Sequence, residues 1–161
     1  MNVAIYMRLS KEDELIRDES NSITNQRMML LKYVRGHEEM KSCKVLQFLD
    51  DGFSVTNLDR PGMRELLDKV KAGLINCIIV KDFSRFARNH IDLGKHLEQI
   101  FPFMGVRFIA INDDYDSKYT DGGISGLGDQ FKMLFYDLYS KDLSDKVKSS
   151  MVALKKQGKF V

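Results

Sequence analysis

The sequence predicts an α/β domain in which helices cover a mostly parallel central sheet. Four apolar runs of strand length recur along residues 3–111, and segments with helical periodicity separate them. Strands that alternate with helices form a parallel sheet, because each helix carries the chain back to the start of the next strand. A further observation, a long apolar stripe at helical spacing near the C-terminus, predicts one extended helix after this domain.

The four expected strands are short apolar runs, mostly bounded by polar residues. They are Val3–Leu9, Lys44–Leu49, Asn76–Lys81 and Val106–Ile111. Alternate residues of a strand face opposite sides, so Tyr6, Arg8 and Ser10 share one face of the first strand. Core packing does not explain an arginine and a serine at the end of an apolar strand. This strand end is therefore a candidate functional site.

Three helices are expected between the strands. The first follows the capping signal Ser20-Asn21-Ser22, the second begins at Arg60-Pro61-Gly62, and the third spans about Asp92 to Phe101. Each carries apolar residues at three- and four-residue intervals, as a helix that covers a sheet must. Pro61 and Pro102 are expected at element boundaries, because proline has no amide proton to donate within a helix.

The segment after the fourth strand breaks this pattern. Residues 112–127, NDDYDSKYTDGGISGL, are polar and glycine-rich, which predicts an exposed, mobile loop. Residues 128–156 then show one uninterrupted helical pattern, which at ~1.5 Å per residue gives a rod roughly 43 Å long. A small domain cannot cover such a helix, so we expect self-association through its apolar stripe. The expected organisation is a domain over residues 1–127 and a long helix over residues 128–161, with further domains after it.

Composition narrows the class of protein. The hydrophobic share of 43% and charged share of 30% are typical of a soluble globular domain. No apolar run approaches the ~20 residues of a membrane span, and no secretion signal opens the chain. We therefore expect a cytoplasmic protein with no membrane partner, in which Cys43 and Cys77 are reduced thiols. The net charge is only +2, but residues 141–159 hold six lysines against two aspartates. This basic segment fits nucleic acid and fits a solvated helix face equally well.

Reactive side chains gather directly after three of the strands, where sites form in open parallel sheets. They are Arg8 and Ser10 after the first; Asp50, Asp51, Ser54, Thr56, Asp59 and Arg60 after the second; and Lys81, Asp82, Ser84, Arg85, Arg88 and Asn89 after the third. Arg85 and Arg88 would face one point if their segment turns helically. Arginine binds phosphate oxygens through a planar fork and stays protonated. A serine among several arginines therefore indicates an enzyme that stabilises a phosphorane-like transition state.

Other chemistries have less support. No GxSxG, HExxH or Walker motif and no Cys/His ligand spacing is present, so neither a hydrolase triad, a metal nor a nucleotide is implied. The same residues also have ordinary interpretations. Ser10 could cap a helix that starts near Lys11, the pair Asp59-Arg60 could be a surface ion pair, and the later arginines could lie in a solvated turn. From the residues alone, the sequence indicates a phosphate-handling α/β domain.

Five segments resemble, in order and spacing, the catalytic domain of serine recombinases. They are YMRLS, ESNSITNQR, DDGFSVTNLDRPG, IIVKDFSRFARN and FPFMGVRFIAINDDYDS. The likeness is closest to the large serine recombinases, transposon-type site-specific recombinases of mobile elements in Gram-positive bacteria, and it covers essentially the whole chain. It implies a resolvase-like fold and a bacterial, nucleoid-associated enzyme that excises or integrates a mobile element.

The resemblance also implies a mechanism. Ser10 would be the nucleophile that attacks a DNA phosphodiester, leaving a 5′-phosphoserine link and a free 3′-hydroxyl. The residues that match the family's phosphate-gripping arginines are Arg8, Arg60, Arg85 and Arg88. Gln26 matches a glutamine that supports the site, and Asp51 an aspartate beside it. Because the phosphoserine bond keeps the energy of the phosphodiester, rejoining needs no ATP, and no metal ion is used.

The implied partners are double-stranded DNA and further copies of the chain, as dimers that meet in a synaptic tetramer. The helix 128–156 looks like the family's interface helix, whose basic end leads toward the DNA minor groove. Lys148, Lys155 and Lys156 are the expected DNA contacts there. Base readout would come from modules after Val161, so the chain alone is expected to bind DNA weakly and with strong salt sensitivity, and to recombine poorly.

The sequence departs from the family at a few positions and leaves other functions open. Ser84 stands where small resolvases have an aspartate, with Asp82 two residues earlier, which favours the large subgroup. Val55 and Asn76 also replace residues usual in relatives. A non-catalytic oligomerisation or regulatory fragment of such a protein would be insensitive to changes at Ser10. A small-molecule phosphohydrolase is a third possibility, although no water-activating base is evident.

Overall fold

The computed structural model describes residues 1–9, 22–50, 59–87 and 89–119. These segments build one sheet with the strand order β2-β1-β3-β4-β5. The strands are β1 (Asn2–Arg8), β2 (Lys44–Asp50), β3 (Cys77–Val80), β4 (Arg107–Ala110) and β5 (Tyr115–Asp116). The first four run parallel, and β5 pairs antiparallel with β4. The prediction of a mostly parallel sheet is therefore confirmed.

Strand β1 lies at the point where the strand order changes direction. It pairs with β2 on one side, from Asn2 opposite Lys44 to Arg8 opposite Asp50, and with β3 on the other side. At such a switch point the connections leave the sheet on opposite sides and open a crevice beyond the carboxyl ends of the strands. The end of β1 therefore lies where an open α/β sheet forms its site.

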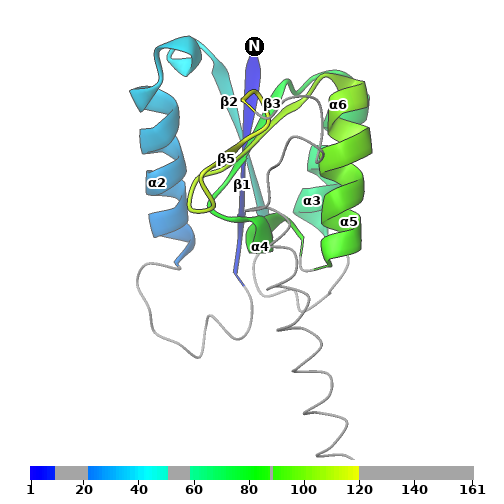
Figure 1. The fold of residues 1–161 in the computed structure, drawn as a ribbon. Coiled ribbons are helices and arrows are strands. Elements are labelled where there is room, and N and C mark those ends of the chain that lie inside the picture. The colour runs from blue at the N-terminus through cyan, green and yellow to red at the C-terminus, as the bar shows by residue number, and fades with distance from the viewer. Residues whose placement is uncertain (10–21, 51–58, 88, 120–161) are drawn as a thin grey trace, which may run out of the picture.

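Helices cover both faces of the sheet (Figure 1). Their bounds are α2 (Ile23–Gly36), η2 (Glu38–Met40), α3 (Pro61–Lys71), α4 (Phe83–Phe86), α5 (His90–Lys95), η3 (His96–Ile100) and α6 (Phe101–Met104). Helix α2 lies on one face, α3, α5 and α6 lie on the other, and the short α4 lies at the carboxyl edge. The side chains of β1 alternate accordingly: Val3, Ile5 and Met7 join the core under α2, whereas Ala4 and Tyr6 join the opposite core.

Local sequence explains where the first two helices begin. The Ser22 hydroxyl accepts a hydrogen bond from the Asn25 amide at 3.1 Å, so the expected cap of α2 is confirmed. Helix α3 starts at Pro61, whose missing amide proton is not needed in a first turn. The next position requires glycine, because α3 comes very close to β2 there. A Cβ on Gly62 would be 2.5 Å from the Leu49 carbonyl oxygen.

The third helical region is longer than expected, and Pro102 lies inside it. Helical structure runs from His90 to Met104 and includes a π-helical turn over His96–Ile100. Pro102 lies in the first turn of α6, directly after the π-helical turn ends at Ile100, so the expectation that it stands at an element boundary is confirmed. Proline donates no backbone hydrogen bond, and the helical turn just before it takes up one extra residue. In this wider turn the Phe101 amide donates to the His96 carbonyl, five residues earlier. The region ends at Gly105, whose φ of 65° is left-handed.

The expectation of an exposed loop over residues 112–127 is only partly right in its described part, residues 112–119, where Asn112, Asp114, Lys118 and Tyr119 are exposed. This part contains β5, and Tyr115 is only 7% exposed. The Tyr115 ring packs 5.2 Å from the Phe83 ring and 6.3 Å from the Phe108 ring, so one aromatic side chain anchors an otherwise polar segment. The expected helix over 128–156, its extension to residue 161 and Lys148, Lys155 and Lys156 all lie outside the described residues.

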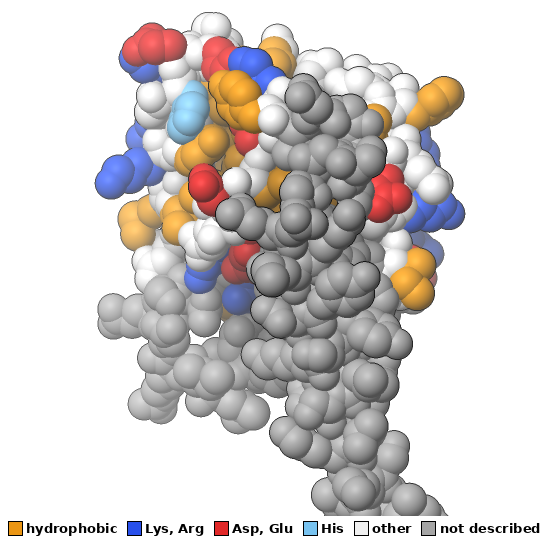
Figure 2. Space-filling model, viewed as in Figure 1, with side chains coloured by type: hydrophobic (Ala, Val, Ile, Leu, Met, Phe, Trp, Pro, Cys, Tyr) orange, Lys and Arg blue, Asp and Glu red, His pale blue; other side chains and the backbone are white. Residues whose placement is uncertain are grey.

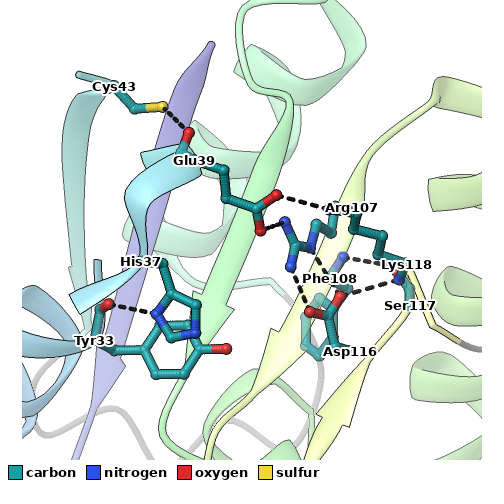
Figure 3. A network of polar contacts seen from close by, with 9 residues as sticks. All are labelled: Tyr33, His37, Glu39, Cys43, Arg107, Phe108, Asp116, Ser117 and Lys118. Atoms are coloured by element: carbon teal, nitrogen blue, oxygen red, sulfur yellow. Dashed lines mark hydrogen bonds and ion pairs between the residues drawn. The ribbon is translucent and has the colours of Figure 1, made fainter. Parts of the chain in front are cut away.

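Strand β5 is held by a network of charged side chains around Arg107, the first residue of β4 (Figure 3). Arg107 donates to both carboxylate oxygens of Asp116 and, at 2.6 Å, to Glu39 of η2. Lys118 donates to the second oxygen of Glu39 at 2.7 Å. These hydrogen bonds hold the pKa of Glu39 down to about 2, Lys118 contributing most. The network ties β4 and β5 to the segment that precedes β2.

On the face shown in Figure 2, acidic, basic and apolar side chains are mixed over the described elements. Both cysteines are free thiols, Cys77 buried and Cys43 half-buried. Within the described segments, no helix has the length and apolar character needed to span a membrane.

Candidate active site at the carboxyl edge of the sheet

Four of the predicted site residues meet at the carboxyl edge of the sheet. Arg8 ends β1, Gln26 lies in the first turns of α2, Arg60 precedes α3, and Arg85 lies in α4. All four are buried, with exposed fractions of 2%, 1%, 2% and 7% in that order. Burial of three guanidinium groups costs free energy unless hydrogen-bond acceptors compensate them. Each of the three arginines therefore needs acceptors within the site.

Gln26 fixes the backbone at the end of β1. Its side-chain oxygen accepts from the Arg8 amide at 3.3 Å, and its side-chain nitrogen donates to the Arg8 carbonyl at 3.1 Å. The amide side chain thus pairs with both polar groups of one residue, much as a neighbouring strand would. This contact holds the last residue of β1 in place.

Arg8 and Arg85 bind each other's backbone across the switch point. Arg8 donates through Nε to the Arg85 carbonyl at 3.2 Å and through Nη2 to the Ser84 carbonyl at 2.6 Å. In return, Nη1 of Arg85 donates to the Arg8 carbonyl at 3.2 Å. The end of β1 and the segment after β3 are therefore locked together by charge-assisted hydrogen bonds.

Arg60, which lies between β2 and α3, contacts the same part of the site. Its Nη2 donates to the Phe86 carbonyl at 2.8 Å, and its guanidinium carbon lies 5.8 Å from the centre of the Tyr6 ring. Within the described part of the chain, the buried Nε of Arg60 has no hydrogen-bond partner. A buried donor left without an acceptor is uncommon, and at a candidate phosphate site it is a donor that an anion would satisfy.

Asp50 is among the reactive residues noted after the second strand, although the resemblance does not assign it a role, and the structure places it at this edge of the sheet. Its carboxylate is 1% exposed and accepts hydrogen bonds from the Tyr6 hydroxyl at 2.8 Å and from the amides of Gly62 and Met63 at 2.8 and 2.9 Å. It thereby places a carboxylate at the first amides of α3, where the helix dipole favours a negative charge. Burial raises the pKa of Tyr6 far above its ordinary value, so this hydroxyl stays protonated and donates.

The position of Asp50 at the end of β2 explains its burial. The resemblance assigns a role to the neighbouring Asp51, which lies outside the described residues. The usable signal was that Asp50 directly continues the apolar run, so strand alternation puts it on the same face as Phe48. Ser10 and Arg88 also lie outside the described residues, and α4 ends at Phe86, before the second arginine of the expected helical turn.

Two further aspartates hold the start of α4. Asp82 accepts from the Arg85 amide at 3.2 Å and from the Ser84 hydroxyl, and it forms an ion pair of 3.6 Å with Nε of Arg85. Asp113, in the turn after β4, accepts from the Phe83 amide at 2.6 Å. Within the described segments, no group of three or more His, Cys, Asp or Glu residues is arranged to hold a metal ion. The arrangement is thus a cluster of arginines framed by carboxylates.

Comparison with known proteins identifies a family. The family described as "Resolvase, N terminal domain" matches residues 3–160. A protein of Bacillus subtilis (strain 168) named "Putative DNA recombinase" is 33% identical over 116 residues, which are 70% of this chain and 21% of that protein. The chain therefore spans about a fifth of the length of this curated relative.

Solved structures show the same fold. The N-terminal catalytic domain of TP901-1 integrase superimposes with a TM-score of 0.62 at 23% identity, covering 91% of this chain and 97% of that one. A resolvase family site-specific recombinase from Streptococcus pneumoniae superimposes with a TM-score of 0.61 at 20% identity, covering 94% and 99%. The predicted fold class, that of a resolvase-like catalytic domain, is confirmed.

Proposed function

The chain belongs to the resolvase N-terminal domain family, and on this premise we propose that it is the catalytic domain of a serine-type site-specific DNA recombinase. The observation that carries the proposal is the convergence of Arg8, Arg60 and Arg85, buried and drawn from three different connections, at the switch point of the sheet. A cluster of fixed, permanently charged forks suits the phosphodiester of DNA.

The proposed nucleophile is Ser10, two residues beyond Arg8. Its hydroxyl oxygen forms a bond to the phosphorus of one DNA strand while the bond from phosphorus to the 3′ oxygen breaks. The serine proton leaves to a base, and the 3′ oxygen gains a proton to become a hydroxyl. Rejoining is the reverse reaction with a 3′-hydroxyl as nucleophile. Since one phosphoester replaces another, neither ATP nor a metal ion is required in this proposal.

The arginines are proposed to stabilise the negative charge that builds up on the phosphate oxygens. Their anchors support this role: each of the three donates to a backbone carbonyl near α4 or β1, so the guanidinium groups are already oriented before DNA arrives. Preorganised charges cost no reorganisation at the moment of reaction. The unpaired Nε of Arg60 is the donor that we assign to a phosphate oxygen. Arg88 is proposed as a fourth contact.

The remaining site residues are proposed to shape this cluster. Gln26 holds the backbone of Arg8, the residue that leads to the nucleophile. Asp51 is proposed to lie beside the phosphate, and Asp50 to orient the start of α3 and with it Arg60. Neither carboxylate would bind the phosphate itself, because like charges repel.

The proposed partners are double-stranded DNA and other copies of the chain. The helix expected over residues 128–156 would join two copies as a dimer and two dimers as a synaptic tetramer, and Lys148, Lys155 and Lys156 would contact the DNA backbone. The biological reaction that we propose is excision or integration of a mobile element. We also propose that the protein acts in the bacterial cytoplasm, at the nucleoid.

A covalent DNA adduct tests the proposal. The natural full-length protein would be incubated with duplexes selected from a random-sequence pool for binding to it, and the products separated under denaturing conditions. We expect an adduct that is lost in Ser10→Ala and falls about a hundredfold in Arg60→Lys, which keeps the charge but loses the fork. Arg64→Lys, on the exposed side of α3, is the matched control. Selective DNA binding without an adduct, or an adduct that survives Ser10→Ala, would refute the proposal.

A further inference from the structure

Helix α4 is too short to hold its own position. It spans only Phe83–Phe86, and four residues cannot form a stable helix in isolation. Yet this helix contributes Arg85 and three backbone carbonyls to the site. The Ser84 and Arg85 carbonyls accept from Arg8, and the Phe86 carbonyl accepts from Arg60. Whatever fixes α4 therefore fixes the arginine cluster.

The first residue of α4 is held by the segment that connects β4 to β5. The carboxylate of Asp113 accepts from the Phe83 amide at 2.6 Å, across 30 residues of sequence. The Phe83 ring is 2% exposed and packs between Phe108 of β4 and Tyr115 of β5, with ring centres 6.2 and 5.2 Å away. Both the backbone and the ring of Phe83 are thus fixed by one neighbouring unit.

The backbone of this unit is shaped to deliver the Asp113 carboxylate. The pairing of β3 with β4 continues past the strands, because the amides of Ile111 and Asn112 donate to the Val80 and Lys81 carbonyls at 3.1 and 2.8 Å. The Asp114 amide then closes a turn to the Ile111 carbonyl at 3.2 Å. Asp114 adopts a φ of 49°, a left-handed conformation that is uncommon for a residue other than glycine. Strain of this kind persists where surrounding contacts over-determine the backbone.

The carboxylate itself is in an unusual place for a surface turn. It is half-buried, and burial raises the pKa of Asp113, with the nearby Asp82 adding to the shift. Partial burial of one carboxylate close to another costs free energy, which the hydrogen bond that it makes must offset. The contact that it makes is the one to α4.

We propose that Asp113 is a positioning residue of the candidate active site, whose carboxylate fixes the start of α4 and thereby the arginine and carbonyl groups that α4 contributes. Asp113 does not contact the arginines in this role; it acts through the Phe83 amide. The inference deepens the proposed function and rests on it, because the position of the arginine cluster affects a reaction only where that cluster performs chemistry.

The test compares variants of the natural full-length protein on the selected duplexes, with the rate of adduct formation and the affinity for DNA measured separately. Asp113→Ala removes the acceptor and should slow adduct formation by about tenfold to a hundredfold, since misplacement by about 1 Å costs on that order. DNA affinity should stay within about twofold. Asp113→Asn keeps an acceptor oxygen and should restore most of the rate. Asp114→Asn removes the same charge from the exposed neighbour and is the control.

Amide hydrogen exchange supplies a second readout that does not depend on activity. Exchange at Phe83 should accelerate at least tenfold in Asp113→Ala and remain slow in the other two variants. If Asp113→Ala does not fold, Asp113→Glu keeps the charge but displaces the oxygen by one methylene, and its adduct rate should fall about tenfold.

The outcomes separate this inference from the proposed function. If the natural protein forms no adduct that depends on Ser10, the proposed function fails and this inference falls with it. If the adduct forms and Asp113→Ala makes it at the natural rate, only this inference is overturned. An Asp113→Asn rate as low as that of Asp113→Ala would also overturn it, because the acceptor would then not be what matters.

Discussion

Asp50 should contribute more to stability than any exposed charged residue of the described surface, because three hydrogen bonds end on its buried carboxylate. Two come from the first amides of α3, at 2.8 and 2.9 Å, and one from the Tyr6 hydroxyl at 2.8 Å. Hydrogen bonds to a charged group contribute about 1.5–3 kcal/mol each, and a buried group left without its partner costs about 1–3 kcal/mol. These values are not additive, since neighbours relax and water enters.

The expected losses form a graded series. Tyr6→Phe removes one donor and leaves both amides paired, so we expect a loss of about 1 kcal/mol in the free energy of unfolding. Asp50→Asn keeps one acceptor oxygen but turns an N–H group toward a donor, which should cost about 2 kcal/mol. Asp50→Ala strands all three donors and should cost about 4 kcal/mol, as breaking a buried network does.

Urea unfolding of the 161-residue chain, followed by circular dichroism at fixed protein concentration, measures these differences. Thermal midpoints should fall by about 2–4 °C for each kcal/mol. Asp68→Ala, which removes a carboxylate from an exposed ion pair with Lys71, is the control and should change stability by less than about 0.5 kcal/mol. The reasoning is refuted if Asp50→Ala stays within about 1 kcal/mol of the natural chain, or if Tyr6→Phe costs as much as Asp50→Ala.

Three other predictions use contacts described above. Gly62→Ala would bring a Cβ to 2.5 Å from a backbone oxygen and should cost about 1–3 kcal/mol in urea unfolding, whereas Gly36→Ala meets nothing within 4 Å and should be neutral or slightly stabilising. The pKa of Glu39 is lowered to about 2, so its contribution to stability is complete above the ordinary value of 4.5 and is lost as the pH falls toward 2. Glu39→Gln should therefore flatten the dependence of the unfolding free energy on pH between 4.5 and 2. An unchanged pH dependence would contradict the role assigned to Glu39. Burial raises the pKa of Cys77 to about 12, so iodoacetamide at pH 8 should modify the half-buried Cys43 in the folded chain, and Cys77 only after unfolding, as peptide mass mapping would show.

Periodicity and capping signals were sufficient for the elements that depend on local sequence. The strand at Val3–Leu9 was expected from apolar alternation, and the start of α2 from Ser22, because both signals act within a few residues. Strand β5 could not be found in this way. Its two residues form a strand where Tyr115 packs against Phe108 and against Phe83, and Phe83 is distant in sequence.

The candidate site likewise has a part that local sequence predicts and a part that depends on contacts distant in sequence. Residue chemistry and strand ends were enough to bring Arg8, Arg60 and Arg85 to one edge of the sheet. The hydrogen-bond partners of these arginines could not be predicted, because they are backbone carbonyls, which every residue type has. The burial of Asp50 likewise depends on strand register, because Asp50 pairs with Arg8 at the ends of β2 and β1.

The hydrogen bonds that build the arginine cluster have a consequence for when the site comes into existence. They join residues 18, 26 and 77 positions apart in the chain, and none of these three closes a local turn. Contacts of such long range form late, since each must first overcome the entropy of closing a large loop. During synthesis the N-terminal strand, with its arginine, therefore emerges well before the carbonyls that orient that arginine. A partly made or partly unfolded chain has the residues of the site but no site, so any reactivity of this edge is tied to completion of the fold.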